Sequence, residues 1–507
     1  MSAFTRPVDR IVADGAARAV VEVDADELIE TAGALLAARF RLALVAAHDD
    51  EGPLRVVYLF TAGPPDRRIE LHVALERHRP QVPSLAHLSF SASRFEREMR
   101  DLFGIEPVGH PQPRRLVLHQ HWPYDWHPLR ADAGPPPAMV DGAAPYPFID
   151  VEGAGIYEIP VGPVHAGLIE PGHFRFWVMG ETIVKMKARL WFVHKGIERL
   201  FEGQDLRLAI TLAERISGDS AIGHSLSYAL AVEEACRIEV PPRAQELRAV
   251  LLELERLYNH VADVGALCND VGFGLANAHA LTLREALLRL NAEVTGHRLL
   301  RGAIVPGGAH LRRLPRLDEL KEISERFHEI VDLARSNTIV MDRFTGTAVL
   351  STSQAEEIGV IGVVARASGL HLDARLAHPF IDPPTGFRPA GHESGDVLAR
   401  FFVRCDEFEA SLALLESYLD RDGSLWASVP DHYGQGGGAG SGIVEGWRGT
   451  VVHRVEVDPN GSLRRVKVVD PSFLNWPALP VALADTIVPD FPLVNKSFNL
   501  SYAGNDL

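Results

Sequence analysis

Residues 247–264 read LRAVLLELERLYNHVADV, and their apolar side chains recur with a helical period. This spacing persists over about five turns, which predicts a long amphipathic helix. The apolar positions are Leu247, Val250, Leu254, Leu257, Val261 and Val264. A second run with the same period covers residues 281–300. Helices of this length bury their apolar faces against one another, so this part of the chain is predicted to form a helical bundle.

The sequence before residue 110 has a different pattern, in which strands and helices alternate. Short β-rich runs at residues 19–23, 42–46, 54–60 and 69–74 accompany a helical stretch at residues 26–39. This order predicts a small α+β domain with an open sheet. A further helix is expected at residues 94–104. Ser91 or Ser93 is its expected N-cap, because a serine hydroxyl can accept a hydrogen bond from a backbone N–H group there.

Proline marks the boundary between these two regions. The segment AGPPPA at residues 133–138, followed by Pro145 and Pro147, predicts an extended linker over residues 133–150. Residues 1–132 and 151–507 are then the two domains. β-rich sequence also occurs at residues 157–178 and from residue 444 onward, with a turn at residues 458–461. We therefore predict an α+β multidomain fold, with a small N-terminal α+β domain before a mainly α-helical domain that has small β regions.

The composition argues against several classes of function. The chain has 507 residues, and 51 lysines and arginines against 67 aspartates and glutamates give a net charge of −16, which disfavours nucleic acid as a partner. No stretch approaches the ~20 apolar residues of a membrane helix, and the first residues lack the apolar core of a signal peptide, so we expect a cytoplasmic protein. Cys236, Cys268 and Cys405 form no pair motif and are expected to be small buried residues.

Two short motifs have the spacing of paired cysteine ligands but contain no cysteine. ERISGDS at residues 214–220 carries Ser217 and Ser220, and DPSFLN at residues 470–475 carries Ser472 and Asn475. Hydroxyl and amide groups are hard, neutral and weak metal donors compared with thiolates. These four side chains are expected to form a small polar cavity that holds water or a ligand, although they could instead simply fill volume.

Motifs along nearly the whole chain resemble two related families. The first part resembles the C subunit of bacterial complex I. The remainder resembles the complex I D subunit and, still more, the large subunits of membrane-bound, energy-converting nickel-iron hydrogenases, including formate hydrogenlyase. The order is that of fused C–D subunits. The motifs are FEREMRDLFGI (95–105), GHP (109–111), RR (114–115), GPVHAGLIEPGHFRF (162–176), HKGIE (194–198), ELERLYNH (253–260), PGG (306–308), RASG (366–369) and EGWRG (445–449).

The resemblance implies that the four cysteines of the hydrogenase nickel site are replaced here by the four polar side chains named above. We therefore expect no nickel and no cofactor bound by this chain alone. Ala478 stands where a hydrogenase has the histidine that often ends its mature chain, so the following tail is expected to stay in place. The two quinone contacts of complex I fall near Pro171 and Gly218, so a quinone would need different contacts.

The resemblance also implies an assembly. Its expected partners are a small subunit with an iron–sulfur cluster, a ferredoxin-like subunit, and membrane subunits that resemble antiporters and anchors. This chain would be peripheral on the inner face of the cell membrane. The implied activity is electron transfer of the NADH:quinone oxidoreductase type, coupled to proton or ion translocation. The chain has no glycine-rich dinucleotide motif, so a partner would handle NADH. The alternative is a structural coupling or assembly subunit without redox turnover.

Several side chains are candidates for proton transfer. Glu170 comes first, because the matching glutamate in hydrogenases relays protons and perturbed carboxylates concentrate at functional sites. His165, His173 and His224 are further candidates, since imidazole titrates in the physiological range. Each of these histidines could equally be structural, with its ring bonded to the backbone.

Charged residues in the same motifs are expected to form pairs. Arg215 and Arg448 would be buried cations, which require carboxylate partners such as Asp219 or Asp470. With the metal and its thiolates both absent, Asp219 would supply the missing negative charge. The polar face of the long helix is expected to form a packed network between helices, with Asn259, His260 and Asp263.

Overall fold

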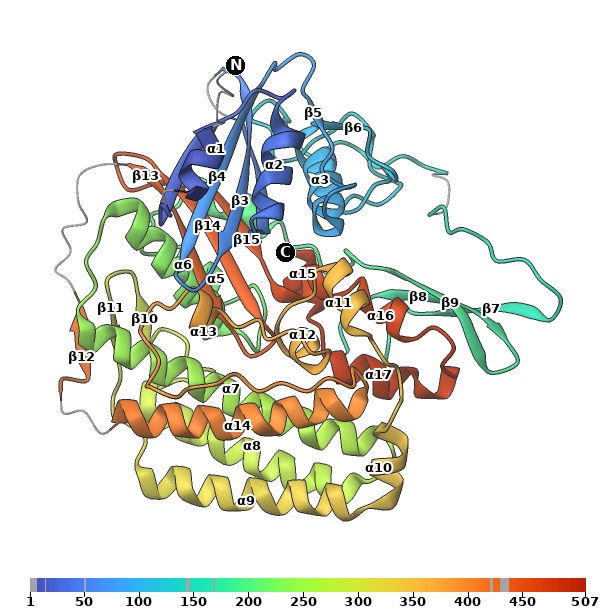
Figure 1. The fold of residues 1–507 in the computed structure, drawn as a ribbon, viewed down its shortest axis with the longest axis vertical. Coiled ribbons are helices and arrows are strands. Elements are labelled where there is room, and N and C mark those ends of the chain that lie inside the picture. The colour runs from blue at the N-terminus through green and yellow to red at the C-terminus, as the bar shows by residue number, and fades with distance from the viewer. Residues whose placement is uncertain are drawn as a thin grey trace.

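The computed structural model describes residues 7–13, 15–49, 52–142, 146–166, 169–419, 423–428 and 437–507. The first six residues, Pro145 of the predicted linker and residues 167–168 of the GPVHAGLIEPGHFRF motif lie outside this set. Figure 1 shows a small sheet with its helices at one end of the molecule, a bundle of long helices at the other, and a second sheet between them. The predicted α+β class is confirmed.

The N-terminal sheet has four strands in the order β1-β4-β3-β2. β1 runs parallel to β4, whereas β3 is antiparallel to both β2 and β4. Helices α1 and α2 accompany this sheet (Figure 1). The predicted strands and the helix between the first two are confirmed. The elements are α1 (Pro7–Ala13), β1 (Arg18–Glu22), α2 (Leu28–Ala37), β2 (Arg41–Asp49), β3 (Leu54–Ala62) and β4 (Arg67–Leu75).

Helix α3 (Phe90–Phe103) packs against β2 and begins earlier than predicted. Its N-cap is Ser89, whose side chain makes no capping hydrogen bond, so the prediction of Ser91 or Ser93 as the cap is wrong. Both serines lie inside the helix, and Ser91 is buried. The helix ends at Gly104, which has φ 69°, a left-handed conformation that glycine adopts without strain. The short strands β5 (Gln81–Pro83) and β6 (Glu106–Val108) pair in parallel beside it.

The described residues between 109 and 155 contain neither helix nor strand, and this stretch includes the predicted linker. It leads into an antiparallel sheet in the order β7-β8-β9, which extends away from the body of the molecule in Figure 1. The strands are β7 (Ile156–Val161), β8 (His173–Met179) and β9 (Thr182–Arg189). The β-rich region predicted here is confirmed, while the exact domain boundaries remain predictions.

Four long helices pack side by side and form the predicted bundle (Figure 1). The longest, α7, has 29 residues, and the six apolar positions that define its period are all buried. α8 and α14 both pack on α7, and α9 packs on α8 and α14. The bundle therefore buries the apolar stripe from which it was predicted. Its helices are α7 (Pro242–Asp270), α8 (Gly274–Thr295), α9 (Leu317–Ser336) and α14 (Val397–Leu419).

A central antiparallel sheet of β13, β14 and β15 lies between the bundle and the N-terminal sheet. Helix α6 packs closely on β13, and glycine makes this approach possible. A Cβ atom at Gly442 would collide with the carbonyl oxygen of Ser227, so no side chain fits at this position. The elements are α6 (Ala221–Cys236), β13 (Gly438–Glu445), β14 (Thr450–Val457) and β15 (Leu463–Val469).

Short elements complete the fold, and those near residue 500 pack against the centre of the molecule. They are α4 (Ile197–Phe201), α5 (Ile210–Ala213), β10 (Ile304–Val305), β11 (Gly308–His310), α10 (Thr338–Phe344), α11 (Thr352–Ile358), α12 (Gly362–Ala367), α13 (Ala374–Ala377), β12 (Trp426–Ser428), α15 (Pro471–Asn475), α16 (Ala478–Ala482), η1 (Val488–Asp490), α17 (Phe491–Phe498) and α18 (Tyr502–Asp506).

Two broader expectations concern cysteine and the membrane. All three cysteines are free and buried, as predicted. Among the helices that the structure describes, none combines the length and the apolar character needed to cross a bilayer.

Candidate functional site

The two cysteine-like motifs lie together, joined by the C-terminal segment. The Ser217 hydroxyl lies 2.8 Å from the hydroxyl of Ser501. The backbone N–H of Ser501 donates to the Ser472 hydroxyl at 2.9 Å. Ser501 therefore bridges one serine of each motif, and all three side chains are buried. We call this group of hydroxyls, together with Ser220, Asp219 and Arg448, the serine cluster.

Asp219 and Arg448 form the charged part of the serine cluster. Two guanidinium nitrogens of Arg448 donate to the two carboxylate oxygens of Asp219 at 2.6 and 2.7 Å. Arg448 is 7% exposed, and its charge also lies over the ring of Trp447. Burial opposes ionisation of Asp219, but the Arg448 guanidinium holds the pKa of this carboxyl below its ordinary value. The predicted pairing of these two residues is confirmed.

The backbone beside Asp219 is also fixed. Its carbonyl oxygen accepts hydrogen bonds from the Trp447 indole N–H at 2.9 Å and from the Asn259 amide at 2.8 Å. The hydroxyl of Ser220 lies 3.1 Å from the same indole nitrogen and 3.3 Å from an Arg448 nitrogen. The turn between Ser217 and Ser220 is therefore held from α7 and from the loop after β13.

Asp470 occupies a separate buried triad beside the serine cluster. Its carboxylate lies 3.0 Å from His224 Nε2, and His224 Nδ1 lies 3.1 Å from His453 Nε2. The three side chains are 0 to 1% exposed. Burial opposes ionisation of Asp470, but the His224 contact and the charge of Arg448 hold its pKa below the ordinary value. Burial lowers the pKa of His453 well below its usual range. Asp470 thus pairs with His224 and not with an arginine.

Asn475 does not point into the serine cluster. Its amide oxygen accepts from the backbone N–H of Ile361 at 2.9 Å, and its amide nitrogen donates to the Ile361 carbonyl at 3.1 Å. The pairing imitates that of a β-strand and ties α15 to the segment before α12. The polar atoms at all four cysteine-like positions bond to protein groups, and those of Asn475 bond to Ile361, away from the serine cluster. The expectation that the four side chains converge on one polar cavity is therefore wrong for Asn475.

Glu170 lies at the edge of the same region. Its carboxylate accepts from the backbone N–H of Ala503 at 3.1 Å, two residues from the bridging Ser501. His165 and His173 hold the loop that carries it. His165 Nε2 lies 2.8 Å from the Gly172 carbonyl oxygen, and His173 Nδ1 lies 3.1 Å from that of Gly162. The structure brings Glu170 to the serine cluster and gives these two histidines structural contacts.

Arg215 is not a buried cation, so that prediction is wrong. Its side chain is 55% exposed and donates to the Thr211 carbonyl oxygen at 2.5 Å, within its own turn. The neighbouring Ala213 and Ile216 take the buried positions of this turn. The local periodicity therefore directs Arg215 outward, away from the serine cluster.

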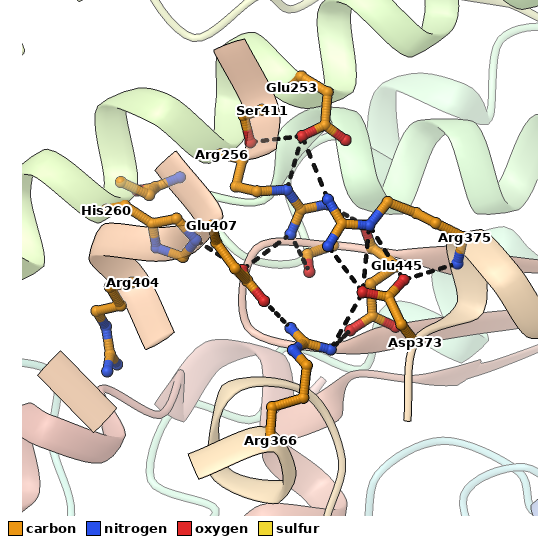
Figure 2. Close-up of polar contacts among 12 residues, drawn as sticks. Glu253, Arg256, His260, Arg366, Asp373, Arg375, Arg404, Glu407, Ser411 and Glu445 are labelled. Atoms are coloured by element: carbon orange, nitrogen blue, oxygen red, sulfur yellow. Dashed lines mark hydrogen bonds and ion pairs between the residues drawn. The ribbon is translucent and has the colours of Figure 1, made fainter. Parts of the chain in front are cut away.

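A larger group of buried charges lies between α7, α14 and the loop after β13 (Figure 2). We call it the buried charge network. It consists of Glu253, Arg256, His260, Arg366, Asp373, Arg375, Glu407 and Glu445. The interhelix network predicted for the polar face of the long helix is therefore present, through His260.

Each carboxylate of the buried charge network faces a cation or a histidine (Figure 2). Glu407 lies 2.8 Å from His260 Nε2 and pairs with Arg366, which lies 2.7 Å from Glu445. Burial opposes ionisation of Glu407, but Arg366 and His260 hold its pKa well below the ordinary value. Burial and the nearby Asp373 raise the pKa of Glu445. Opposite charges therefore outweigh burial at Glu407, whereas burial and Asp373 outweigh Arg366 at Glu445.

The buried charge network positions Arg448. Arg256 donates to the backbone carbonyl oxygens of Glu445 and Gly446 at 2.6 and 3.0 Å. The Glu445 carboxylate accepts from the Thr450 hydroxyl at 2.8 Å. These bonds fix the loop between β13 and β14, which carries Trp447 and Arg448.

A second connection reaches Arg448 from α7. Arg448 donates to the Asn499 carbonyl oxygen at 2.5 Å, and the Asn499 amide donates to Asp263 at 2.6 Å. Arg404, labelled in Figure 2, donates to the other oxygen of Asp263 at 2.6 Å. The arginine of the serine cluster is thereby held from both sides, which limits the positions that its guanidinium can take.

Glu255 is a candidate that sequence reasoning missed. It is 1% exposed and accepts from the backbone N–H groups of Ile222 and Gly223 at 2.6 and 2.9 Å. Burial raises the pKa of Glu255 to about 8, and the negative charge of Asp219 adds to this shift. Glu255 lies in the ELERLYNH motif, which marks it as a candidate. The motif does not show that its carboxyl lies near Asp219.

Comparison with known proteins places this arrangement in a family. Residues 21–137 match the respiratory-chain NADH dehydrogenase 30 kDa subunit family, residues 270–432 match its 49 kDa subunit family, and residues 195–267 match the nickel-dependent hydrogenase family. Formate hydrogenlyase subunit 5 of Escherichia coli (strain K12) is 32% identical, over 86% of this chain and 79% of its own. The chain belongs to the family of fused complex I C–D-type and hydrogenase large subunits.

Other members of the large-subunit family match over similar lengths. Hydrogenase-4 component G of Escherichia coli (strain K12) is 34% identical, over 84% of this chain and 76% of its own. The C/D subunit of the NADH-quinone oxidoreductase of Bacteroides thetaiotaomicron is 30% identical, over 72% of this chain and 74% of its own. The solved structure of the membrane-bound sulfane sulfur reductase, an archaeal respiratory membrane complex, contains a chain with TM-score 0.64 and 27% identity, covering 70% of this chain and 99% of that one.

The donors at the four cysteine-like positions do not fit a nickel-iron centre. Such a centre requires soft thiolates, whereas this member of the large-subunit family offers three hydroxyls and an amide, each already bonded to protein groups. Within the described residues, no three or more histidine, cysteine, aspartate or glutamate side chains are grouped to hold a metal ion.

Proposed function

We propose that this chain is the C–D-like large subunit of a membrane-associated oxidoreductase that has no nickel in this subunit. Its complex would couple electron transfer of the NADH:quinone oxidoreductase type to the movement of protons or ions. The observation that carries the proposal is the pair of Asp219 and Arg448. A fixed carboxylate neutralises the arginine at a place where the relatives with cysteines would have thiolates.

The expected partners follow from the same relationship. A small subunit with an iron–sulfur cluster would deliver electrons next to the serine cluster, with a ferredoxin-like subunit upstream and antiporter-like and anchor subunits in the membrane. This chain would then lie on the inner face of the membrane. Any quinone would need contacts other than those of complex I.

The role proposed for this chain is proton transfer and conformational coupling. Glu170 lies at the loop edge of the serine cluster, and Ser501 links that edge to Ser217. Lys195 donates to the Ile216 carbonyl oxygen at 2.7 Å and adds a cation near Glu170. A carboxylate in such a position is within reach of groups that could pass a proton to it.

The test uses the intact complex, purified through a tag on this chain. Glu170→Gln should abolish quinone-dependent turnover while all subunits remain. Glu181→Gln, an exposed glutamate in the turn between β8 and β9, is the matched control and should leave turnover unchanged. Full turnover in Glu170→Gln would contradict the proton role.

A second candidate function is a coupling subunit without redox turnover. The observation that favours it is the pairing of the serine cluster with groups of this chain, which leaves its hydroxyls and charges in structural bonds and not free to bind a substrate. The two candidates differ in one result. Reduction of the neighbouring iron–sulfur cluster by a substrate, with turnover, supports the redox role, and its absence with every donor and quinone tried supports the coupling role.

A further inference from the structure

A basic groove lies where the N-terminal domain meets the sheet of β7, β8 and β9. It has a volume of about 550 Å³ and is formed by α3, the loop after β6, residues 146–149, β9 and α16. Six cations line it, which are Arg94, Arg97, Arg114, Lys185, Lys187 and Arg189. No described aspartate or glutamate lines it. This concentration of positive charge stands out in a chain whose net charge is −16.

The carboxylates that act on these cations lie outside the groove lining: Glu98 and Asp506 act on Arg94, and Asp101 acts on Arg97 and Arg189. Arg94 donates to the side-chain oxygen of Asn505 at 2.9 Å, and the other three arginines bond to backbone oxygens. Arg97 donates to the Arg114 carbonyl oxygen at 2.7 Å, and Arg114 donates to that of Pro147 at 3.1 Å. Arg189 donates to the Leu118 carbonyl oxygen at 3.2 Å. These bonds orient the guanidinium groups and bring no described carboxylate into the groove itself.

Two of these arginines also retain unused donors. Arg189 is 4% exposed and Arg94 is partly buried, and the Nε atom of each is buried without a hydrogen-bond partner. A buried N–H group without a partner is rare in a folded protein, since it loses its bond to water. Burial, followed by the neighbouring Arg97, lowers the pKa of Arg94 to about 9. An anion in the groove would offset the mutual repulsion of these neighbouring cations.

The arrangement of the cations indicates the shape of that anion. Lys185, Lys187 and Arg189 are alternate residues of β9, so their side chains leave the same face of the sheet about 7 Å apart. Acidic side chains at alternate positions of an extended peptide have the same repeat. The walls add aromatic rings and prolines, including Trp191 and Pro147, and aromatic and arginine side chains are enriched at protein interfaces.

We propose that the basic groove is the docking site for an extended acidic segment of a partner subunit. The segment carries carboxylates at alternate positions opposite Lys185, Lys187 and Arg189. The site spans both domains of the chain, so a bound segment also fixes the domains to each other. This inference does not depend on the redox chemistry of the serine cluster.

The test is photo-crosslinking in the intact complex, purified through a tag on this chain. A benzoylphenylalanine replaces Gln112, an exposed residue that lines the groove. The expected product is a crosslink to a segment of another subunit in which Asp and Glu alternate with other residues. The double variant Lys185→Glu/Lys187→Glu should lose this crosslink and should retain that subunit roughly tenfold less well in low-salt buffer, since like charges then face each other with little screening.

Controls separate docking from charge and from folding. Lys321→Glu/Arg335→Glu makes the same change in charge on exposed residues of α9 and should keep both the crosslink and the subunit. Lys187→Gln is a milder variant that should weaken retention without a change of charge sign. A crosslink to a segment without acidic residues, to lipid alone or to no polypeptide would overturn the proposal. An intact complex in Lys185→Glu/Lys187→Glu would also overturn the proposal. The same holds if pyrophosphate stabilises the isolated chain through these lysines while the charge reversal leaves the complex unaffected.

Discussion

Asp219 and Arg448 form a pair in which each charge supplies the counter-ion that the other needs. The arginine is buried in the fold of this chain and cannot be left without an anion, and Asp219 supplies one through two hydrogen bonds. The identity of the pair could be predicted from the sequence, because both residues lie in recognisable motifs. The outward position of Arg215 could not be predicted, because it depends on which neighbouring residues of the turn are buried in the core.

Asp219→Asn should destabilise the purified chain by about 2 kcal/mol. Removing one member of a buried pair costs ~3–5 kcal/mol, and the partial exposure of the Asp219 side chain reduces this. The free energy of unfolding in urea measures the effect. The double variant Asp219→Asn/Arg448→Gln should recover part of the loss, because no unpaired charge remains. Equal losses in the single and double variants would contradict the pairing.

Glu255 gives a dependence of stability on pH. Its pKa is about 8 in the folded chain and 4.5 as the ordinary value, so the folded state favours the neutral carboxyl. The stability from this group is present below pH ~4.5 and is lost as the pH rises through about 8. Glu255→Gln should therefore gain stability relative to the native chain as the pH rises from 5 to 8.

Thermal unfolding at a series of pH values measures this gain. Each pKa unit corresponds to about 1.4 kcal/mol, so the gain should reach several kcal/mol. Glu357→Gln, on the exposed side of α11, is the control and should follow the native chain at every pH. A Glu255→Gln curve parallel to the native curve would show that Glu255 does not titrate in this range.

Among the elements, those with a local pattern were predictable and those held by distant contacts were not. The helical repeat of apolar residues at 247–264 predicted α7, because the buried face of an amphipathic helix appears in the sequence as such a repeat. The start of α3 was missed, because Ser89 makes no capping bond and the helix begins without that signal. The loop between β13 and β14 has no period of its own, and its shape comes from Arg256 on α7.

Arg256→Ala should loosen this loop and destabilise the chain by about 3–5 kcal/mol. The variant removes two bonds to the loop and leaves Glu253 and Glu407 without one of their cations. Hydrogen exchange of residues 445–450 should become faster, which separates a loop effect from general destabilisation. Arg289→Ala on the exposed face of α8 removes a surface pair with Glu285 and should cost less than ~1 kcal/mol. Unchanged exchange at residues 445–450 would contradict the role of Arg256.

For the whole molecule, buried ion pairs join segments that are far apart in the sequence. Lys467 on β15 lies 2.8 Å from Glu98 on α3 and 3.0 Å from Glu198 on α4. Burial opposes ionisation of Glu198, but Arg465 and Lys467 lower its pKa to about 2. The composition and the family motifs predict two domains. They do not predict the contact between Lys467 and Glu98, because these residues are 369 positions apart and no local sequence pattern links them.

Lys467→Met should destabilise the contact between the domains by about 3–5 kcal/mol, because two buried carboxylates lose their shared cation. Unfolding followed by domain-specific probes should then show two transitions in place of one. Acid should affect the native chain through the same group. The stability that Glu198 contributes is present above pH ~4.5 and is lost as the pH falls towards about 2. A single transition with unchanged midpoint in Lys467→Met would show that the domains are coupled elsewhere.

We expect this chain to hold no nickel, and elemental analysis of the intact complex measures this. The complex is purified through a tag on this chain from cells supplied with nickel, and nickel and iron are measured per chain. We predict iron from the partner subunits and no stoichiometric nickel, because the donors at Ser217, Ser220, Ser472 and Asn475 are hydroxyls and an amide. One nickel bound per copy of this chain would contradict it.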